Sequence, residues 1–437
     1  MWSAAAEQPS SGADSRRVPN IVFILADDLG YGDVQCLNPE GKIATPNLDR
    51  LAAAGMVFTD AHSSSAVCTP TRYSILTGRY NWRSSLKNGV LGGYSPRLIE
   101  TGRYFGISAS LDMPPYVFIE NDRVRGVPTV EKTWIRKGPA HADFEAIDVL
   151  PTLTAKAVKY IDQRAAEAQA GRPFCLYLPL NSPHTPILPT AEWQGKSGLN
   201  AYGDFVMQTD QAVGQVLQAL DRGGLRESTL VIFASDNGCS PSANFPQLAA
   251  QGHHPSYRFR GHKADIFDGG HRIPCLARWP GRIPAGSASD QLVCLVDWMA
   301  TCADILGAKL PETAGEDSVS LLPALLGQAR GPLREAVVQH SINGSFSIRQ
   351  GRWKLELCPD SGGWSAPKPG SAEAKRLPSI QLYDLVADIG EQHNVHDEHP
   401  EVVDRLTKLL EKYVADGRST PGAPQPNTGD VKLGKNR

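Results

Sequence analysis

Short apolar runs alternate with longer amphipathic segments over most of this chain, and this alternation limits the fold more than any other feature. Residues 21–26, 173–180 and 228–235 are apolar runs of strand length, typical of strands that are buried on both faces of a sheet. Residues 150–171 and 202–224 repeat apolar side chains at helical spacing. We therefore predict an α/β fold with a mainly parallel sheet flanked by helices.

The pattern changes after about residue 327. Short apolar segments separated by turn residues precede a final helix-like segment, which predicts a smaller C-terminal antiparallel α+β domain. The end of the chain is rich in proline, glycine and polar residues, a composition typical of disorder. We predict a disordered N-terminal segment, a main α/β domain, a C-terminal α+β domain and a disordered tail, at residues 1–18, 19–327, 328–416 and 417–437.

The composition argues against several classes of protein. The chain has 437 residues and a net charge of −2, so nothing indicates nucleic acid or an anionic membrane as a partner. No apolar run is long enough to span a membrane. The eight cysteines include no CxxC pair, which argues against a zinc knuckle or a thioredoxin-type redox site. Small residues followed by a polar run near the N-terminus resemble what remains at a signal cleavage site, so we expect a periplasmic or secreted protein.

Oxygen-bearing side chains follow two of the predicted strands. Asp27 and Asp28 come after the first strand, and Asp236 and Asn237 come after a later one. Strand ends that meet at one edge of a sheet would bring these groups together, and the carboxylates would repel one another unless a cation lay between them. Oxygen ligands suit calcium or magnesium rather than zinc. Either pair alone is common in turns, but the presence of both pairs directly after apolar strands favours a metal site.

A short helix is predicted over residues 70–78, and Cys68 lies just ahead of it. The residues that follow this cysteine are hydroxyl side chains, a proline and an arginine. Arg72, one helical turn along, would place a guanidinium beside the thiol at a helix N-terminus, where negative charge is stabilised. This arrangement is typical of a nucleophile, and the alternative is a buried structural cysteine.

Two further cationic side chains are candidates. His184 follows another strand end, and Lys263 lies in a basic, glycine-containing loop over residues 258–272. If they belong to a functional site, both side chains would bind an anion. If they do not, His184 is an ordinary loop histidine and Lys263 belongs to a solvent-exposed basic loop. A nucleophile, a hard divalent cation and an anion clamp on an α/β sheet suit transfer of a sulfuryl or a phosphoryl group. The residues alone leave both reactions open.

The segment from Cys68 to Arg72, Cys-Thr-Pro-Thr-Arg, matches the Cys-x-Pro-x-Arg signature of the type I sulfatases. The segments LADDLGYGD, NSPHTP, SDNG, GHKADIFDGGHRIP and RWPG also resemble family segments and occur in the family's order. They look like those of arylsulfatase A-like and N-acetylgalactosamine-6-sulfatase-like enzymes. The resemblance implies an alkaline-phosphatase-like fold and the hydrolysis of sulfate esters, either aryl sulfates or sulfated sugars.

The resemblance also implies the role of each site residue. In the family, a separate formylglycine-generating enzyme oxidises the signature cysteine, here Cys68, to Cα-formylglycine, which attacks sulfur. Arg72 would stabilise the formylglycine, and His184 and Lys263 would hold the sulfate and assist the leaving group. The implied calcium ligands are strand-end side chains and residue 68: Asp27, Asp28, Cys68, Asp236 and Asn237.

The chain departs from the family in one place. Family members carry a Gly-Lys-x-His-x-Gly segment whose lysine and histidine contact the formylglycine, and no such segment occurs here. Lys132, Lys137 and His141 lie in the corresponding part of the chain without the family's context, so we assign them no role. The chain is internally shortened relative to the family. Two alternatives stay open: a phosphate or phosphonate monoester hydrolase on the same scaffold, and a shortened, catalytically impaired pseudo-sulfatase.

Overall fold

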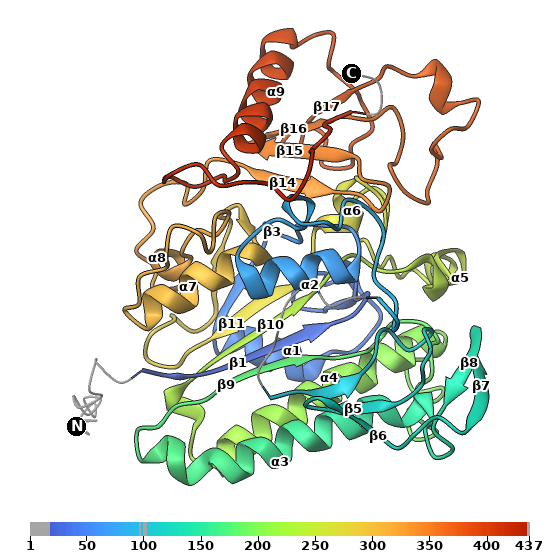
Figure 1. Cartoon of the computed structure of the whole chain (residues 1–437), viewed down its shortest axis with the longest axis vertical. Coiled ribbons are helices and arrows are strands. Elements are labelled where there is room, and N and C mark those ends of the chain that lie inside the picture. The colour runs from blue at the N-terminus through green and yellow to red at the C-terminus, as the bar shows by residue number, and fades with distance from the viewer. Residues whose placement is uncertain (1–17, 96–97, 99–102, 435–437) are drawn as a thin grey trace, which may run out of the picture.

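A computed structural model describes residues 18–95, 98 and 103–434. Its central sheet consists of β1 (Asn20–Ala26), β2 (Met56–Phe58), β9 (Cys175–Pro179), β10 (Thr229–Ser235), β11 (Cys275–Arg278) and β12 (Ser287–Ser289). The strand order is β12-β2-β11-β10-β1-β9 (Figure 1). Strand β1 pairs in parallel with β10 and β9, and β12 pairs in parallel with β2, whereas β11 is antiparallel to both of its neighbours. The sheet is therefore mixed, and its parallel centre is the part that the apolar runs predict.

Helices cover both faces of this sheet. One face packs on α1 (Pro46–Ala53), α3 (Val149–Gln169) and α4 (Ala201–Arg222), and the other on α2 (Cys68–Thr77), α7 (Trp298–Ile305) and α8 (Leu322–Leu325). In β1, Val22 and Ile24 belong to the first core, whereas Phe23 and Leu25 belong to the second. Because both faces are covered, this strand has an unbroken apolar sequence instead of an alternating one.

Helix α2 begins earlier than predicted. It starts at Cys68 rather than at Pro70, and the proline lies in the first turn, where the N–H that it lacks would have no helical partner. Gly78 follows the last turn with φ +64°, a left-handed conformation that glycine adopts without strain. The early start places the cysteine at the N-terminus of the helix and Arg72 one turn along.

Between α2 and α3 the chain forms small antiparallel sheets that the sequence pattern does not predict. Their strands are β4 (Phe105–Ile107), β5 (Phe118–Glu120), β6 (Arg123–Arg125), β7 (Val130–Trp134) and β8 (Arg136–Ala140). These strands are short and largely exposed, so they lack the apolar runs that mark the central sheet. Other short elements are β3 (Ala61–His62), β13 (Val293–Cys294), α5 (Phe245–Ala250) and α6 (Asp268–His271).

The predicted C-terminal α+β domain is present. It contains an antiparallel sheet of β14 (Val337–His340), β15 (Phe346–Gln350), β16 (Trp353–Glu356) and β17 (Gln381–Asp384), covered by α9 (Pro400–Ala415) (Figure 1). Leu406 and Leu410 of α9 share a buried core with Ile348 and Leu355 of the sheet. The apolar spacing along the helix is therefore satisfied within the smaller domain.

Residues 417–434 form neither helix nor strand, but they lie against the rest of the protein. The backbone N–H of Thr428 donates to the carbonyl of Arg83 at 2.7 Å, and the Arg83 side chain donates to Asn427 at 3.1 Å. Val431 and Leu433 pack against the C-terminal core. This arrangement differs from the predicted disordered tail. The predicted disordered N-terminal segment lies outside the described residues except for its last one, Val18.

No helix in the described part of the chain combines the length and apolar character that a membrane span requires.

Candidate active site

The strand-end side chains lie together at one edge of the central sheet. Ala26 of β1 is paired with Ser235 of β10, so the residues that follow these strands are neighbours. The N–H of Asp28 donates to Oδ1 of Asp236 at 3.3 Å, and Nδ2 of Asn237 donates to Oδ1 of Asp28 at 2.7 Å. These three residues are fully buried. The parallel register thus produces the convergence that the sequence pattern predicts.

Two oxygen atoms of this cluster have no hydrogen-bond partner within the described parts of the chain. They are Oδ1 of Asp27 and Oδ1 of Asn237, and both are buried. A buried oxygen without a partner is costly, and a hard cation is a partner that suits it. Ligand atoms of Asp27, Cys68 and Asp236 also lie within 4.8 Å of one another. The donor set therefore fits calcium or magnesium.

Arg72 reaches this cluster from α2. Its Nε lies 2.8 Å from Oδ2 of Asp236, and its Nη2 lies 3.1 Å from Oδ2 of Asp27. Burial opposes the charged form of the guanidinium, but the two carboxylates outweigh burial and raise the pKa of Arg72 well above its usual value. Arg72 therefore stays positively charged and holds the two carboxylates in place.

Cys68 is the first residue of α2 rather than a residue ahead of the helix, and the electrostatics of its thiol also differ from the prediction. Burial, together with the negative charge of Asp27, raises the pKa of Cys68 to about 12. The positive charges of Lys263 and Arg72 do not overcome these effects, because both cations are paired with carboxylates. At neutral pH the thiol stays protonated, and an unmodified Cys68 is a poor nucleophile.

Lys263 and His184 approach the same carboxylate from two different loops. Nζ of Lys263 lies 2.7 Å from Oδ1 of Asp28, and Nε2 of His184 lies 3.6 Å from Oδ2 of Asp28. Burial opposes ionisation of Asp28, yet Lys263 and His184 together hold the pKa of that carboxyl below its usual range. The Nδ1 atom of His184 contacts the carbonyl of Thr185, which leaves Nε2 directed at the cluster. Each predicted site residue is therefore part of one constellation.

The protein-family model described as Sulfatase matches residues 19–101 and 103–308 of this chain. The chain belongs to the sulfatase family. It is 31% identical to the N-acetylgalactosamine-6-O-sulfatase of Bacteroides thetaiotaomicron, over 92% of this chain and 94% of that protein. It is 30% identical to human arylsulfatase A, over 96% of this chain and 93% of that protein. These matches confirm the family that the sequence motifs indicate, and the enzyme is a sulfuric ester hydrolase.

A solved structure from work on glycosaminoglycan metabolism by Bacteroides thetaiotaomicron is similar to this sulfatase. The two share a TM-score of 0.81 and 30% identity, over 91% of this chain and 99% of the other. The predicted alkaline-phosphatase-like fold is therefore confirmed.

This sulfatase is shorter than its relative. The alignment with the Bacteroides N-acetylgalactosamine-6-O-sulfatase runs over 498 positions, more than the 437 residues of this chain. The relative thus carries residues without a counterpart here, in keeping with the missing Gly-Lys-x-His-x-Gly segment. Lys132 and Lys137 form ion pairs at 2.6 and 2.7 Å with nearby glutamates, and the His141 ring packs beside Gly126. These contacts hold the three side chains near the β7–β8 hairpin.

Most of the basic loop in this sulfatase supports the fold and does not clamp an anion. Arg260 donates to the carbonyl of Glu391 at 2.6 Å, and Arg272 pairs with Asp268 at 2.8 Å. Lys263 is the member of the loop that reaches the strand-end cluster. The loop is thus neither wholly solvated nor wholly catalytic, because Arg260 and Arg272 bind other groups of the protein.

A buried support beneath the site was not apparent from the sequence. Oδ2 of Asp33 accepts from the Tyr202 hydroxyl and from the N–H of Gly30, while Oδ1 lies 2.8 Å from Nε2 of His253. The Tyr202 hydroxyl oxygen also lies 3.2 Å from the carbonyl oxygen of Asp28. His253 is therefore a buried support for Asp33. Its partners lie far away in the sequence, so no local signal reveals this role.

Asn181 is a second polar residue to which the sequence assigns no specific role, although it lies at a predicted strand end. It follows β9, and neither of its buried amide atoms has a partner in the described regions. Nη2 of Arg72 lies 3.4 Å from the carbonyl of the preceding residue, Leu180, so Asn181 borders the site. The NSPHTP segment contains Asn181, but the histidine is its more conspicuous member.

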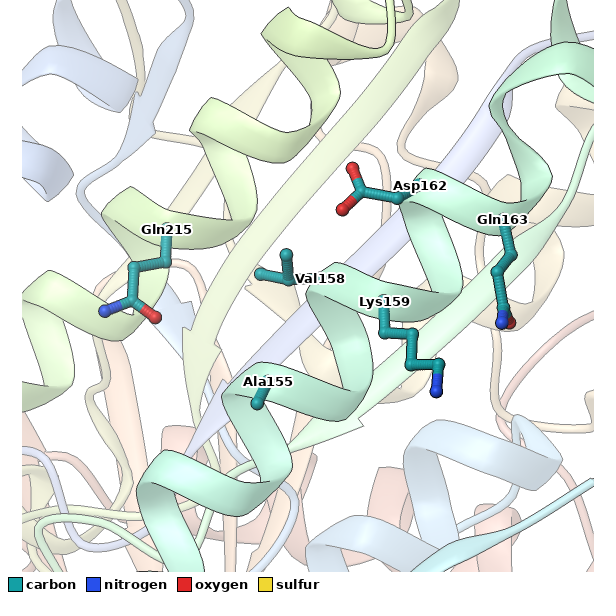
Figure 2. Close-up of a pocket in the computed structure, with 6 residues that line it drawn as sticks. All are labelled: Ala155, Val158, Lys159, Asp162, Gln163 and Gln215. Carbon is teal, nitrogen blue, oxygen red and sulfur yellow. The ribbon is translucent and has the colours of Figure 1, made fainter.

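A surface pocket lies apart from this chemistry. It is lined by residues of α3 and α4: Ala155, Val158, Lys159, Asp162, Gln163 and Gln215 (Figure 2). None of them belongs to the strand-end cluster. The pocket therefore has no part in the sulfatase site.

Proposed function

We propose that this sulfatase hydrolyses the sulfate esters of sugars or aryl alcohols with calcium and a formylglycine made from Cys68. The observation that supports this most is that Oδ1 of Asp27 and Oδ1 of Asn237 have no partner among the described residues, while Asp27 lies beside Cys68. A buried oxygen cluster without a cation would be self-repelling, and a thiol with a pKa of about 12 would not attack sulfur. Both features are accounted for if the site receives a metal and a modified residue 68.

The proposed calcium ligands are the strand-end oxygens and residue 68: Asp27, Asp28, Cys68, Asp236 and Asn237. A bound calcium ion would offset the carboxylate charge and attract the oxygens of the sulfate group. Oxidation of Cys68 by a formylglycine-generating enzyme would supply an oxygen nucleophile in place of a protonated thiol.

The cationic side chains prepare the site for an anionic substrate. Arg72 fixes the carboxylates of Asp27 and Asp236 through direct contacts. The ammonium of Lys263 is held at Asp28, where it can attract a sulfate oxygen as negative charge builds up on the leaving group. Nε2 of His184 lies on the same side of Asp28, in position to give a proton to the departing alcohol.

The names of the relatives support a sulfated sugar as the substrate. The Bacteroides relative is an N-acetylgalactosamine-6-O-sulfatase and the human relative is arylsulfatase A. We therefore propose N-acetylgalactosamine 6-sulfate as the first natural-type substrate to test, with an aryl sulfate as the chromogenic one.

The experiment is an ester-selectivity assay on protein co-expressed with a formylglycine-generating enzyme. We expect release of alcohol from an aryl sulfate in the presence of calcium, with much slower release from the matched aryl phosphate and phosphonate. The Cys68→Ala variant is the control and should be inactive on all three. Faster hydrolysis of the phosphate or phosphonate would replace this proposal by the monoester-hydrolase alternative.

The missing Gly-Lys-x-His-x-Gly segment favours the second alternative, a pseudo-sulfatase. Such a protein would bind sulfated sugars without turning them over. The test uses protein that is loaded with metal and modified at residue 68. If this protein binds N-acetylgalactosamine 6-sulfate saturably but releases no sulfate, the result supports a pseudo-sulfatase and contradicts the proposed hydrolase.

A further inference from the structure

We propose that Trp364 forms a sugar-binding platform beside the sulfatase site and contacts the pyranose ring that carries the sulfate. The inference rests on the proposed function and deepens it, because it assigns a specificity-determining residue to the C-terminal domain.

The loop that carries Trp364 is internally braced. The N–H of Gly362 donates to Oδ1 of Asp360 at 2.8 Å, and the hydroxyl of Ser361 donates to the carbonyl of Ser365 at 2.8 Å. The N–H of Ser361 donates to the carbonyl of Pro367 at 2.9 Å. A loop with this many internal hydrogen bonds presents its exposed side chain at a low entropic cost.

Asp265 fastens this loop to the segment that carries Lys263. Oδ1 of Asp265 accepts from the N–H groups of Trp364 and Ser365 at 2.8 and 3.0 Å, and Oδ2 accepts from the N–H of His262 at 3.0 Å. Asp265 is fully buried, so solvent does not compete for these charge-assisted bonds. The backbone of Trp364 is thus anchored to Asp265, which lies two residues along the chain from Lys263.

The same loop approaches the backbone on the Cys68 side. The N–H of Ile266 donates to the carbonyl of Ser361 at 2.7 Å, and a Cβ at Gly363 would lie 2.4 Å from the carbonyl oxygen of Ala264. The N–H of Ala264 in turn donates to the carbonyl of Ala66 at 2.8 Å. Only glycine permits so close an approach. The loop is therefore packed onto a segment that also contacts the chain just before Cys68.

The Trp364 side chain is partly exposed. Trp364 is 42% exposed, and it is the only tryptophan within the described residues that belongs to the exposed class. A large rigid ring with an apolar face binds the C–H face of a sugar with little loss of conformational entropy. If the sulfate group binds at Lys263, the position of the loop indicates that the sugar ring carrying this sulfate contacts Trp364.

The first experiment compares Trp364→Ala with the parent enzyme. For N-acetylgalactosamine 6-sulfate we expect KM to rise about tenfold with kcat nearly unchanged. Inhibition by inorganic sulfate, which has no ring, should stay the same. Trp364→Phe should recover part of the lost affinity. Leu377→Ala is the matched control, because Leu377 is 40% exposed in the same domain but lies outside the loop, and it should behave like the parent.

The second experiment separates this inference from the proposed function. In a Cys68→Ala background, which cannot turn over, calorimetric titration with N-acetylgalactosamine 6-sulfate should show weaker binding, by about tenfold, after Trp364→Ala. Asp265→Asn should weaken binding of the sugar more than binding of sulfate, because it loosens the loop. Equal losses for sugar and sulfate, or no loss for either, would overturn the platform. A parent enzyme that binds the sugar through Trp364 yet hydrolyses no sulfate ester would overturn only the proposed function.

Discussion

Nζ of Lys263 lies 2.7 Å from Oδ1 and 2.8 Å from Oδ2 of Asp28, although 235 residues separate the two in the chain. Arg72 contacts Asp27 and Asp236 in a comparable way. Three buried carboxylates therefore lie together at the strand ends, and burial together with the charge of Asp27 raises the pKa of Asp236 to about 7. A divalent cation would relieve the repulsion among these carboxylates.

Removal of one carboxylate tests the proposed calcium site. We expect Asp236→Ala to lose bound calcium and at least about 100-fold in activity, because the remaining ligands are too few and Arg72 loses a partner. Elemental analysis of the purified protein measures the metal. Asp162→Ala, at the surface pocket of α3, is the matched control and should keep both. Full calcium occupancy in Asp236→Ala would show that the cation site is assigned wrongly.

Modification of Cys68 is tested by peptide mass spectrometry. Active enzyme should contain formylglycine at residue 68, and Cys68→Ser should lose catalytic turnover, because serine is not converted by the same oxidation and gives a stable ester. Cys36→Ser, at an exposed cysteine, serves as the control and should leave activity unchanged. Fully active enzyme with an intact Cys68 thiol would contradict the mechanism.

The missing Gly-Lys-x-His-x-Gly segment predicts an imbalance between the two half-reactions. Attack on sulfur retains Arg72, His184 and Lys263, whereas release of sulfate lacks the family histidine. Loss of a positioned base typically costs about 10²–10⁴-fold in rate. We expect a rapid burst of alcohol from an aryl sulfate followed by a slow steady rate, measured by stopped flow. Linear turnover without a burst would mean that another group supplies the base or that release of the alcohol is limiting.

Two buried histidines predict a loss of stability in acid. Burial lowers the pKa of His62 and of His340 from 6.5 to about 4. The unfolded chain binds these protons first, so the stability is fully present above pH 6.5 and is lost as the pH falls toward 4. The loss approaches roughly 3 kcal/mol for each histidine. Urea unfolding at several pH values in this range measures it.

Replacement of these histidines tests the cause of the acid sensitivity. The double variant His62→Gln, His340→Asn should be less stable at neutral pH, because buried contacts are lost, but its stability should depend less on pH. His393→Gln, at a side chain that is 83% exposed, should keep the parent's pH dependence. An unchanged slope in the double variant would assign the acid sensitivity to other groups.

The local features of the site were predictable from the sequence alone. Asp27 and Asp236 follow apolar strands, and a parallel register places the ends of neighbouring strands together. The Cys-x-Pro-x-Arg signature identifies Cys68 and Arg72 because their chemistry depends on residues within one helical turn. The same locality made the α/β core predictable, since buried strands require continuous apolar runs. The small β4–β8 strands were missed because exposed strands have no such requirement.

The tertiary structure decided what depends on groups that are distant in the chain. The pKa of the Cys68 thiol is set by burial and by Asp27, which overcome the stabilising effect expected at a helix N-terminus. Lys263 pairs with Asp28 at the site, whereas Arg272 of the same loop pairs with Asp268. Desolvation and long-range ion pairing are properties of the folded protein. The sequence by itself therefore determined the family and which residues meet at the strand ends, and only the tertiary structure decided the charge state and partner of each.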